Sequence, residues 1–171
     1  MNNQKQKEII VKKGTWNENT EFQYRLSRAL PDGVVSTAVS ACVYYGDSIV
    51  MIKNRRGYEI VCGHVEERET IEQALAREIL EETGCEIESS EMFAYTYVHN
   101  TVKQFSKSTG LEYPEFSYIP YFFVIAKNPP QETDADDIHE FQLCLITDEI
   151  IQNSTDRDLV LMSSVVRYCK G

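Results

Sequence analysis

Apolar and polar residues alternate along most of this chain in a way that predicts β-strands on both sides of one amphipathic helix. Residues 21–27 alternate with a period of two, and residues 34–45 and 48–53 are rich in Val, Ile and Tyr. Gly46-Asp47 separates the last two runs, so we expect a hairpin there. The same criteria predict further strands at residues 58–62, 87–98, 116–126 and 141–145.

The helical signals concentrate at residues 71–83. Thr70 can cap the helix, Gln73 completes a capping box with it, and Gly84 stands where a C-cap glycine belongs. Shorter helical patterns follow at residues 147–152 and 158–168.

Neither repeats nor a linker divide the sequence, and its 171 residues suit one compact domain. We therefore expect residues 1–171 to form a single domain, with about 15 flexible residues at the polar N-terminus.

Acidic residues outnumber basic ones by 27 to 17, which gives a net charge of −10. A surface of this sign repels phosphate backbones, so we do not expect a nucleic acid polymer as partner. Five scattered cysteines without a Cys-x-x-Cys pair indicate free thiols in a reducing compartment. No apolar run approaches the ~18 residues of a membrane span, so we expect a cytoplasmic protein without a membrane partner.

The helix at 71–83 carries acidic residues where its apolar stripe should continue. Ile71 and Leu75 define an inward-facing stripe, yet Glu78 and Glu82 occupy it one heptad later, with Glu81 beside them. Ile79 and Leu80 are expected to lie aside from this stripe.

A helix face rich in Glu is most often simply solvated, and that interpretation stays open. If the three carboxylates do face inward, their charge needs a cation, because burying unpartnered carboxylates costs several kcal/mol each. Arg77 alone cannot neutralise them, whereas divalent ions that prefer oxygen ligands can, which points to Mg²⁺ or a similar hard ion.

Gly63, Glu69 with five residues between them, and the run from Arg77 to Cys85 together resemble the Nudix hydrolase signature, with every charged and glycine position filled. The resemblance implies an α/β/α sandwich with a mixed β-sheet. Three positions depart from the usual pattern: Cys62 and Arg68 replace glycines, and Cys85 replaces a large aliphatic residue. The first two make the loop backbone less permissive. We expect Cys62 to be a buried structural thiol rather than a nucleophile.

The resemblance also implies roles for the residues of the motif. Glu78 and Glu82 would be the principal ligands of Mg²⁺ or Mn²⁺, and Glu81 a further ligand or the base that activates water. The carbonyl of Gly63 would complete the ligand set. Glu69 and Arg77 would pair to brace the loop against the helix, although Arg77 could equally support Glu81 on the helix itself.

Candidates outside the motif rest on weaker patterns. The resemblance implies that a later carboxylate joins the metal site, and Glu140 is our choice because a Glu precedes an aromatic residue at a similar place in mutator-type members. The rivals are Glu132, Asp136 and Asp137, and a solvated acidic loop is the alternative. Basic side chains after a strand could hold phosphates, unless they are only a charged hairpin turn: Lys53, Arg55 and Arg56.

Tyrosines on the predicted strands could stack on a base, although aromatic residues at period two more often belong to the core. Tyr95 and Tyr97 are the candidates in one strand, where we expect Phe93 to share their side, and Tyr118 is the candidate in another.

By resemblance, the expected activity is Mg²⁺-dependent hydrolysis of the pyrophosphate linkage in a nucleoside diphosphate joined to another group, for which a nucleoside triphosphate is the default. The alternatives are a catalytically silent Nudix domain that binds a nucleotide as a regulator, and a cation-binding interaction protein. The silent domain usually lacks motif carboxylates, and none is missing here. Small members of the family often pair, so a homodimer is compatible with the resemblance.

Overall fold

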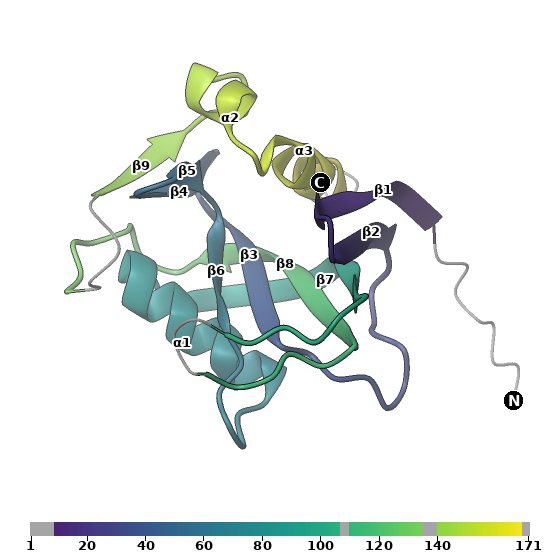
Figure 1. Cartoon of the computed structure of the whole chain (residues 1–171). Coiled ribbons are helices and arrows are strands. Elements are labelled where there is room, and N and C mark those ends of the chain that lie inside the picture. Colours follow the sequence, from purple (N-terminus) through teal and green to yellow (C-terminus); the bar gives the residue numbers. More distant parts are fainter. Residues whose placement is uncertain (1–8, 107–109, 135–139, 169–171) are drawn as a thin grey trace, which may run out of the picture.

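The computed structural model describes residues 9–106, 110–134 and 140–168. Nine strands and three helices follow one another in these residues (Figure 1): β1 (Ile9–Asn17), β2 (Thr20–Leu26), β3 (Ala38–Tyr45), β4 (Ser48–Asn54), β5 (Gly57–Glu59), β6 (Val61–His64), α1 (Ile71–Thr83), β7 (Ile87–Asn100), β8 (Phe116–Ala126), β9 (Glu140–Cys144), α2 (Glu149–Asn153) and α3 (Arg157–Tyr168).

The strands form one mixed sheet between two layers of helix. The strand order is β1-β2-β7-β8-β3-β4-β5, with β6 paired to β3 and β9 paired to β4. Only the β3–β8 pair is parallel among the paired strands described. Helix α1 lies on one side of the sheet and α2 and α3 on the other (Figure 1). This is the expected α/β/α sandwich.

Strand β3 explains why its sequence is apolar at almost every position. Val39, Ala41 and Val43 belong to the hydrophobic core on the α1 side. Cys42 and Tyr44 belong to the second core, together with Leu159 and Val160 of α3. A strand covered on both faces has no solvent-facing positions, so its sequence loses the alternation of a half-exposed strand.

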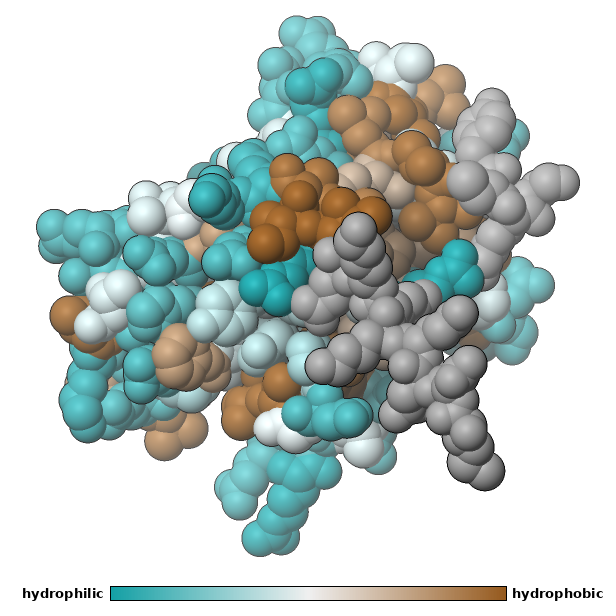
Figure 2. Space-filling view, turned by 90° about the vertical axis from the view of Figure 1, so that its right-hand side faces the viewer, coloured by the Kyte–Doolittle hydropathy of each residue, from teal (hydrophilic) through white to brown (hydrophobic). Residues whose placement is uncertain are grey.

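Strand β1 begins within the N-terminal stretch that we expect to be flexible, of which residues 1–8 lie outside the described residues. Residues 9–17 pair antiparallel with β2, and every one of them is exposed. Backbone hydrogen bonds, rather than burial, therefore place this strand at the edge of the sheet. Figure 2 looks onto the side of the molecule that carries β1, where apolar surface gathers. Within β1, Ile9, Ile10 and Val11 are exposed apolar residues.

A bulge in β7 corrects one expectation about the aromatic residues. The register between β7 and β8 shifts between Met92 and Ala94, so the residue between them, Phe93, changes face. Phe93 packs in the core on the α3 side, whereas Tyr95 packs in the core on the α1 side. The two side chains do not share one face, because the bulge inserts an extra residue into the alternation.

The short strand expected at residues 58–62 is two strands with different partners. β5 pairs with β4 through Glu59 and Ile52, and β6 pairs with β3 through Val61 and Ala41. Ile60 lies between them. Since β6 ends in the turn that leads to α1, this change of partner positions the loop carrying the signature.

None of the helices in the described part of the chain has both the length and the apolar character needed to cross a membrane.

Candidate active site

Helix α1 begins and ends where its sequence signals place it. Thr70 Oγ1 accepts a hydrogen bond from the Gln73 amide at 3.2 Å, and the Gln73 side chain accepts one from the Thr70 amide at 2.9 Å. Gly84 closes the helix in the left-handed conformation, at φ 65°. The helix therefore presents its glutamates at fixed positions relative to β6.

The apolar face of α1 is broader than the sequence analysis predicts. Ile79 is fully buried in the core on the α1 side, together with Ala74 and Leu75, whereas Leu80 is 54% exposed. The expectation that Ile79 lies aside is therefore wrong. The glutamates border this face instead of replacing it.

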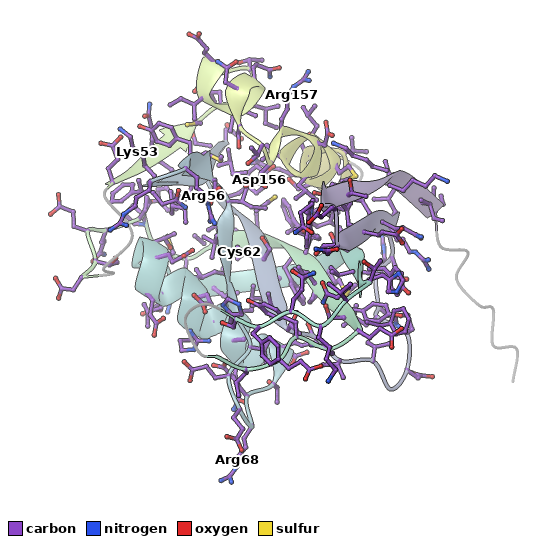
Figure 3. The ribbon with its side chains drawn as sticks, in the orientation of Figure 1. Lys53, Arg56, Cys62, Arg68, Asp156 and Arg157 are labelled. Atoms are coloured by element: carbon purple, nitrogen blue, oxygen red, sulfur yellow. The ribbon has the colours of Figure 1, made fainter. Side chains whose placement is uncertain are left out.

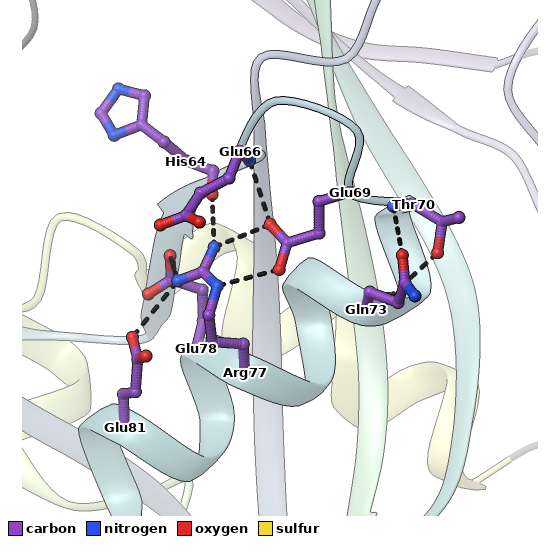
Figure 4. Close-up of polar contacts among 8 residues, drawn as sticks. All are labelled: His64, Glu66, Glu69, Thr70, Gln73, Arg77, Glu78 and Glu81. Atoms are coloured by element: carbon purple, nitrogen blue, oxygen red, sulfur yellow. Dashed lines mark hydrogen bonds and ion pairs between the residues drawn. The ribbon is translucent and has the colours of Figure 1, made fainter.

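Arg77 and Glu69 form a two-point ion pair that ties the loop to the helix (Figure 4). Arg77 Nε and Nη2 donate to the two carboxylate oxygens of Glu69, both at 2.9 Å, and Nη2 also donates to the His64 carbonyl at 2.9 Å. Glu69 in turn accepts from the Glu66 amide at 3.0 Å. These hydrogen bonds, led by the one from Arg77, lower the pKa of Glu69 to about 2. The expected brace is present in the described geometry.

Glu78 lies directly against Gly63. A methyl group at Gly63 would come within 1.7 Å of the Glu78 carboxyl carbon, which no side chain could tolerate without displacing that carboxylate. Arg77 Nη1 holds the same carboxylate at 2.7 Å, and the Glu78 side chain is only 12% exposed. Thus the glycine of the signature is required here for space.

Glu82 is a half-buried carboxylate with little compensation for its charge. Its Oε2 accepts a hydrogen bond from the Cys62 amide at 3.2 Å. Burial raises the pKa of Glu82 to about 8, the Cys62 amide opposes this rise, and the neighbouring carboxylates, Glu78 foremost, add to it. A cation at this position would remove the cost of the ionised form.

Glu81 differs from its two neighbours because it is 56% exposed and accepts from Arg77 Nη1 at 3.2 Å. With Glu78 turned to Arg77 and Glu82 to Cys62, the three carboxylates do not converge. Within the described ranges, no group of three His, Cys, Asp or Glu side chains is close enough to hold a metal ion.

The oxygen atoms gathered here are nonetheless of the chemical type that binds a hard divalent ion. Carboxylates and the Gly63 carbonyl are the oxygen ligands that Mg²⁺ prefers. One guanidinium, that of Arg77, pairs with Glu69, Glu78 and Glu81. Glu82 has no such partner among the described contacts, and burial, foremost, raises its pKa. Glu78 and Glu81 would need to turn from Arg77 to share an ion with Glu82.

Arg68 adopts the backbone conformation of the glycine that it replaces. Its φ of 70° lies in the left-handed region, and among the non-glycine residues described it alone has a positive φ. The side chain points away from the body of the molecule (Figure 3) and is 90% exposed. The loop therefore keeps its shape at the cost of local backbone strain.

The expectation of a buried thiol at Cys62 is wrong, because its side chain is exposed. Val61 and Cys62 point to opposite faces of β6, and Val61 takes the position in the core on the α1 side. The side chain of Cys62 therefore lies on the face of β6 opposite to the core on the α1 side. What contributes to the site is its backbone amide, through Glu82.

Two of the three basic candidates, Lys53 and Arg56, bind carboxylates outside the α1 glutamates. Lys53 Nζ binds Glu140 Oε1 at 2.9 Å across the β4–β9 pair, and the Tyr58 hydroxyl also donates to that oxygen. Arg56 binds both carboxylate oxygens of Glu59. Arg55 has an exposed side chain.

Arg56 also lines a cavity of about 340 Å³ between the β4–β5 hairpin and α2, formed with Gly57, Tyr58, Glu149, Ile150, Asn153, Ser154 and Thr155. Glu140 as a metal ligand and the three basic residues as phosphate ligands stay predictions. Asp136 and Asp137, the rivals of Glu140, lie outside the described residues.

The candidate stacking residues contact one another. The Tyr118 ring lies 5.5 Å from the rings of both Tyr95 and Tyr97, and the Arg25 guanidinium lies 5.4 Å from the centre of the Tyr97 ring. Tyr95 is fully buried. Tyr95 therefore belongs to the hydrophobic core, which is the alternative to base stacking that the sequence analysis gives.

Asp156 is the residue near the site that the sequence analysis misses. Its Oδ2 accepts the Ile60 amide hydrogen at 3.0 Å, just before β6 begins. Burial raises the pKa of Asp156 to about 6, although the Ile60 amide opposes the rise. In the sequence, Asp156 is a polar residue just before a helical pattern, which suggests only a helix cap. The sequence therefore contains no signal for the hydrogen bond to Ile60.

Several solved structures share this fold. The pyrophosphohydrolase BsRppH of Bacillus subtilis aligns with a TM-score of 0.60 at 18% identity, over 85% of this chain and 92% of that one. The NUDIX domain of Shewanella oneidensis NrtR, solved with ADP ribose, aligns at 0.55 and 13%, over 77% and 87%. A C. elegans Ap4A hydrolase aligns at 0.54 and 15%, over 80% and 100%.

No curated protein matches the chain by sequence. A family model described as the NUDIX domain, however, matches residues 35–161, a span that holds Gly63, the Glu69–Arg77 pair, the α1 glutamates and Asp156. Because this family model covers most of the chain, the protein belongs to the Nudix family.

Proposed function

We propose that this protein is a Mg²⁺-dependent hydrolase that cleaves the pyrophosphate linkage of a nucleoside diphosphate joined to another group. The observation that supports this most is the placement of Glu78 against Gly63, next to the half-buried Glu82. The carboxylates of Glu78 and Glu82 offer hard oxygen ligands where α1 lies against β6. Mn²⁺ is the natural substitute, since it takes the same oxygen ligands.

In this proposal Glu78, Glu82 and the Gly63 carbonyl hold the metal, and Glu81 is a further ligand or the base that takes a proton from water. A bound divalent ion supplies charge neutralisation for the diphosphate and acidifies a bound water. Arg77 keeps the loop and the helix in register through Glu69, so that the donors stay within reach of one another. Glu140 would join as the later carboxylate after releasing Lys53, which would then be available for a phosphate.

The substrate is proposed only by class. The structures that share the fold include proteins whose titles name ADP ribose and Ap4A. Both compounds contain the linkage named above, and a nucleoside triphosphate contains it as well. We infer from the sequence that the protein works as a single domain in the cytoplasm, and a homodimer stays a prediction.

A silent regulatory domain is the second candidate, but no observation favours it. Glu78, Glu81 and Glu82 are all present, and the Glu69–Arg77 pair that positions them is complete. A domain that only bound nucleotides would not need this set.

The deciding experiment is a screen of nucleoside triphosphates, nucleotide sugars, dinucleoside polyphosphates and ADP-ribose with Mg²⁺ and Mn²⁺, with release of phosphorylated products as the readout. Glu82→Gln should abolish turnover and keep the fold, because it removes a ligand at constant volume. Glu72→Gln, at an exposed position of the same helix, is the matched control and should keep wild-type turnover. Unchanged hydrolysis by Glu82→Gln would contradict the proposal.

A further inference from the structure

The chain changes partner strand at Ile60, three residues before Gly63. Glu59 still pairs with β4, and Val61 already pairs with β3. Ile60 is 2% exposed, and its amide belongs to neither ladder. A buried amide outside the sheet needs an acceptor from elsewhere, since leaving it unpaired costs about as much as a lost hydrogen bond.

That acceptor is Asp156, in the connection between α2 and α3. Its Oδ2 lies 3.0 Å from the Ile60 nitrogen. Two residues earlier, Ser154 Oγ donates to the Tyr58 carbonyl at 3.0 Å and accepts from the Asp156 amide at 3.1 Å. The connection is thus fastened to the strand on both sides of Glu59.

Asp156 itself is mounted on a rigid element. Its carbonyl accepts from the Val160 amide at 3.0 Å in the first turn of α3. Val160 and its neighbour Leu159 are buried against the sheet. The buried hydroxyls of Tyr44 in β3 and Ser163 in α3 are joined at 2.7 Å. Helix α3 therefore fixes Asp156 relative to the same sheet that carries β6.

Strand β6, which follows the Ile60 amide held by Asp156, contacts two of the α1 glutamates through Cys62 and Gly63. The Cys62 amide donates to Glu82, and Gly63 has no room for even one more carbon beside Glu78. A displacement of β6 by a fraction of an ångström would change both contacts. Misplacing catalytic groups by about 1 Å can cost on the order of a hundredfold in rate.

We propose that Asp156 is a positioning residue for the α1 glutamates: by holding the Ile60 amide it sets where β6 presents Cys62 to Glu82 and Gly63 to Glu78. This role rests on the proposed hydrolase function, because the glutamates are its point of action. Asp156 acts here through a hydrogen bond to the backbone, and contact with the substrate plays no part.

The hydrogen bond can be separated from the charge. Asp156→Asn keeps an oxygen that accepts from the Ile60 amide but removes the negative charge, whereas Asp156→Ala removes both. Asp158→Asn is the matched control, since Asp158 lies two residues further along and binds only the exposed Lys12, at 2.8 Å, in the described contacts.

The first experiment measures two properties of each variant and of the wild type: Mn²⁺ affinity, by titration, and kcat and KM on the best substrate of the screen. Asp156→Ala should weaken Mn²⁺ binding and lower kcat, each by about 10- to 100-fold, as expected for a residue that orients ligands. KM should change by less than about threefold, because the substrate is not touched. In Asp156→Asn, the Mn²⁺ affinity and kcat should stay within about threefold of the wild-type values. Asp158→Asn should have the wild-type values.

Amide hydrogen exchange over residues 58–64 tests the positioning step without any activity. Exchange there should rise in Asp156→Ala and stay at the wild-type rate in Asp156→Asn and Asp158→Asn. If the wild type hydrolyses nothing, the proposed function fails while this measurement still decides whether Asp156 holds β6.

The proposal is overturned if folded Asp156→Ala keeps wild-type Mn²⁺ affinity and kcat, or if Asp156→Asn is as damaged as Asp156→Ala, since the charge would then matter. If Asp156→Ala does not fold, Ser154→Ala takes its place. That variant loosens the same connection and should lower Mn²⁺ affinity and kcat by about three- to tenfold, and no loss there would equally overturn the proposal.

Discussion

The carboxylate of Glu78 occupies the space that a side chain at Gly63 would need. A β-carbon on Gly63 would lie 1.9 and 2.1 Å from the two Glu78 oxygens. Gly63 does not have a positive φ, so its backbone could be adopted by any residue. The requirement for glycine at this position is therefore steric and comes from the helix opposite.

Gly63→Ala should displace Glu78 and damage the site without unfolding the protein. Turnover and Mn²⁺ affinity should both fall by about 10- to 100-fold, because a ligand is moved out of place. Enzyme assays and Mn²⁺ titration measure the two effects. Gly14→Ala is the matched control: Gly14 also has ordinary backbone geometry, and its nearest obstacle is the ring end of Phe22, at 3.1 Å. Equal activity of the two variants would contradict the steric argument.

Arg77→Lys should fail to replace arginine. The guanidinium of Arg77 binds both oxygens of Glu69 and also reaches the His64 carbonyl and Glu78. An ammonium is a point donor and cannot reproduce this planar fork. We expect kcat to fall about tenfold or more, with the fold retained by circular dichroism.

The control for that variant is Arg28→Lys, which alters a single ion pair to Glu91, at 3.3 Å, on an exposed arginine. It should leave kcat unchanged, since exposed ion pairs contribute about 0–1 kcal/mol. Wild-type kcat in Arg77→Lys would show that charge alone is enough at this position.

Arg68→Gly should stabilise the protein slightly and leave its activity alone. A non-glycine residue in the left-handed region costs about 1 kcal/mol or more, and the gain is reduced because glycine makes the unfolded chain more flexible. Arg68 is 90% exposed, and its ion pair with Glu67 is long, at 3.8 Å, so little is lost. Denaturant unfolding should show a gain of up to about 1 kcal/mol. A loss of stability would mean that the Arg68 side chain contributes to the loop.

The sequence predicted the elements that carry strong local signals. Helix α1 runs over residues 71–83 because Thr70, Gln73 and Gly84 define its ends by local hydrogen bonds and backbone conformation. The Glu69–Arg77 pair was also accessible from sequence, since the signature fixes its spacing.

Features that depend on distant contacts could not be predicted in this way. Strand β1 is stabilised by its ladder with β2 and has no buried face. The bulge that turns Phe93 to the other face depends on the pairing of β7 with β8. Asp156 and Ile60 are 96 residues apart in the sequence. No local sequence pattern at either residue predicts their hydrogen bond.

The metal-free protein should lose stability as the pH rises, and Glu82 is the main reason. Its pKa rises from 4.5 to about 8 on folding, so between these values the folded state keeps a proton that the unfolded state has released. The free energy of unfolding should therefore fall as the pH rises through this range, by on the order of a few kcal/mol at most. Asp156, whose pKa rises from 3.8 to about 6, acts in the same direction over a lower range.

Thermal unfolding in EDTA between pH 5 and pH 8 measures this dependence. Glu82→Gln should flatten it, because the amide cannot ionise, while Glu72→Gln should keep the wild-type slope. Mg²⁺ should stabilise the wild type more at pH 8 than at pH 5, because the ion binds the ionised carboxylate and repays its burial. It should have much less effect on Glu82→Gln. An equal response of both proteins to Mg²⁺ at pH 8 would place the ion away from Glu82, and an unchanged pH slope in the variant would mean that another group titrates.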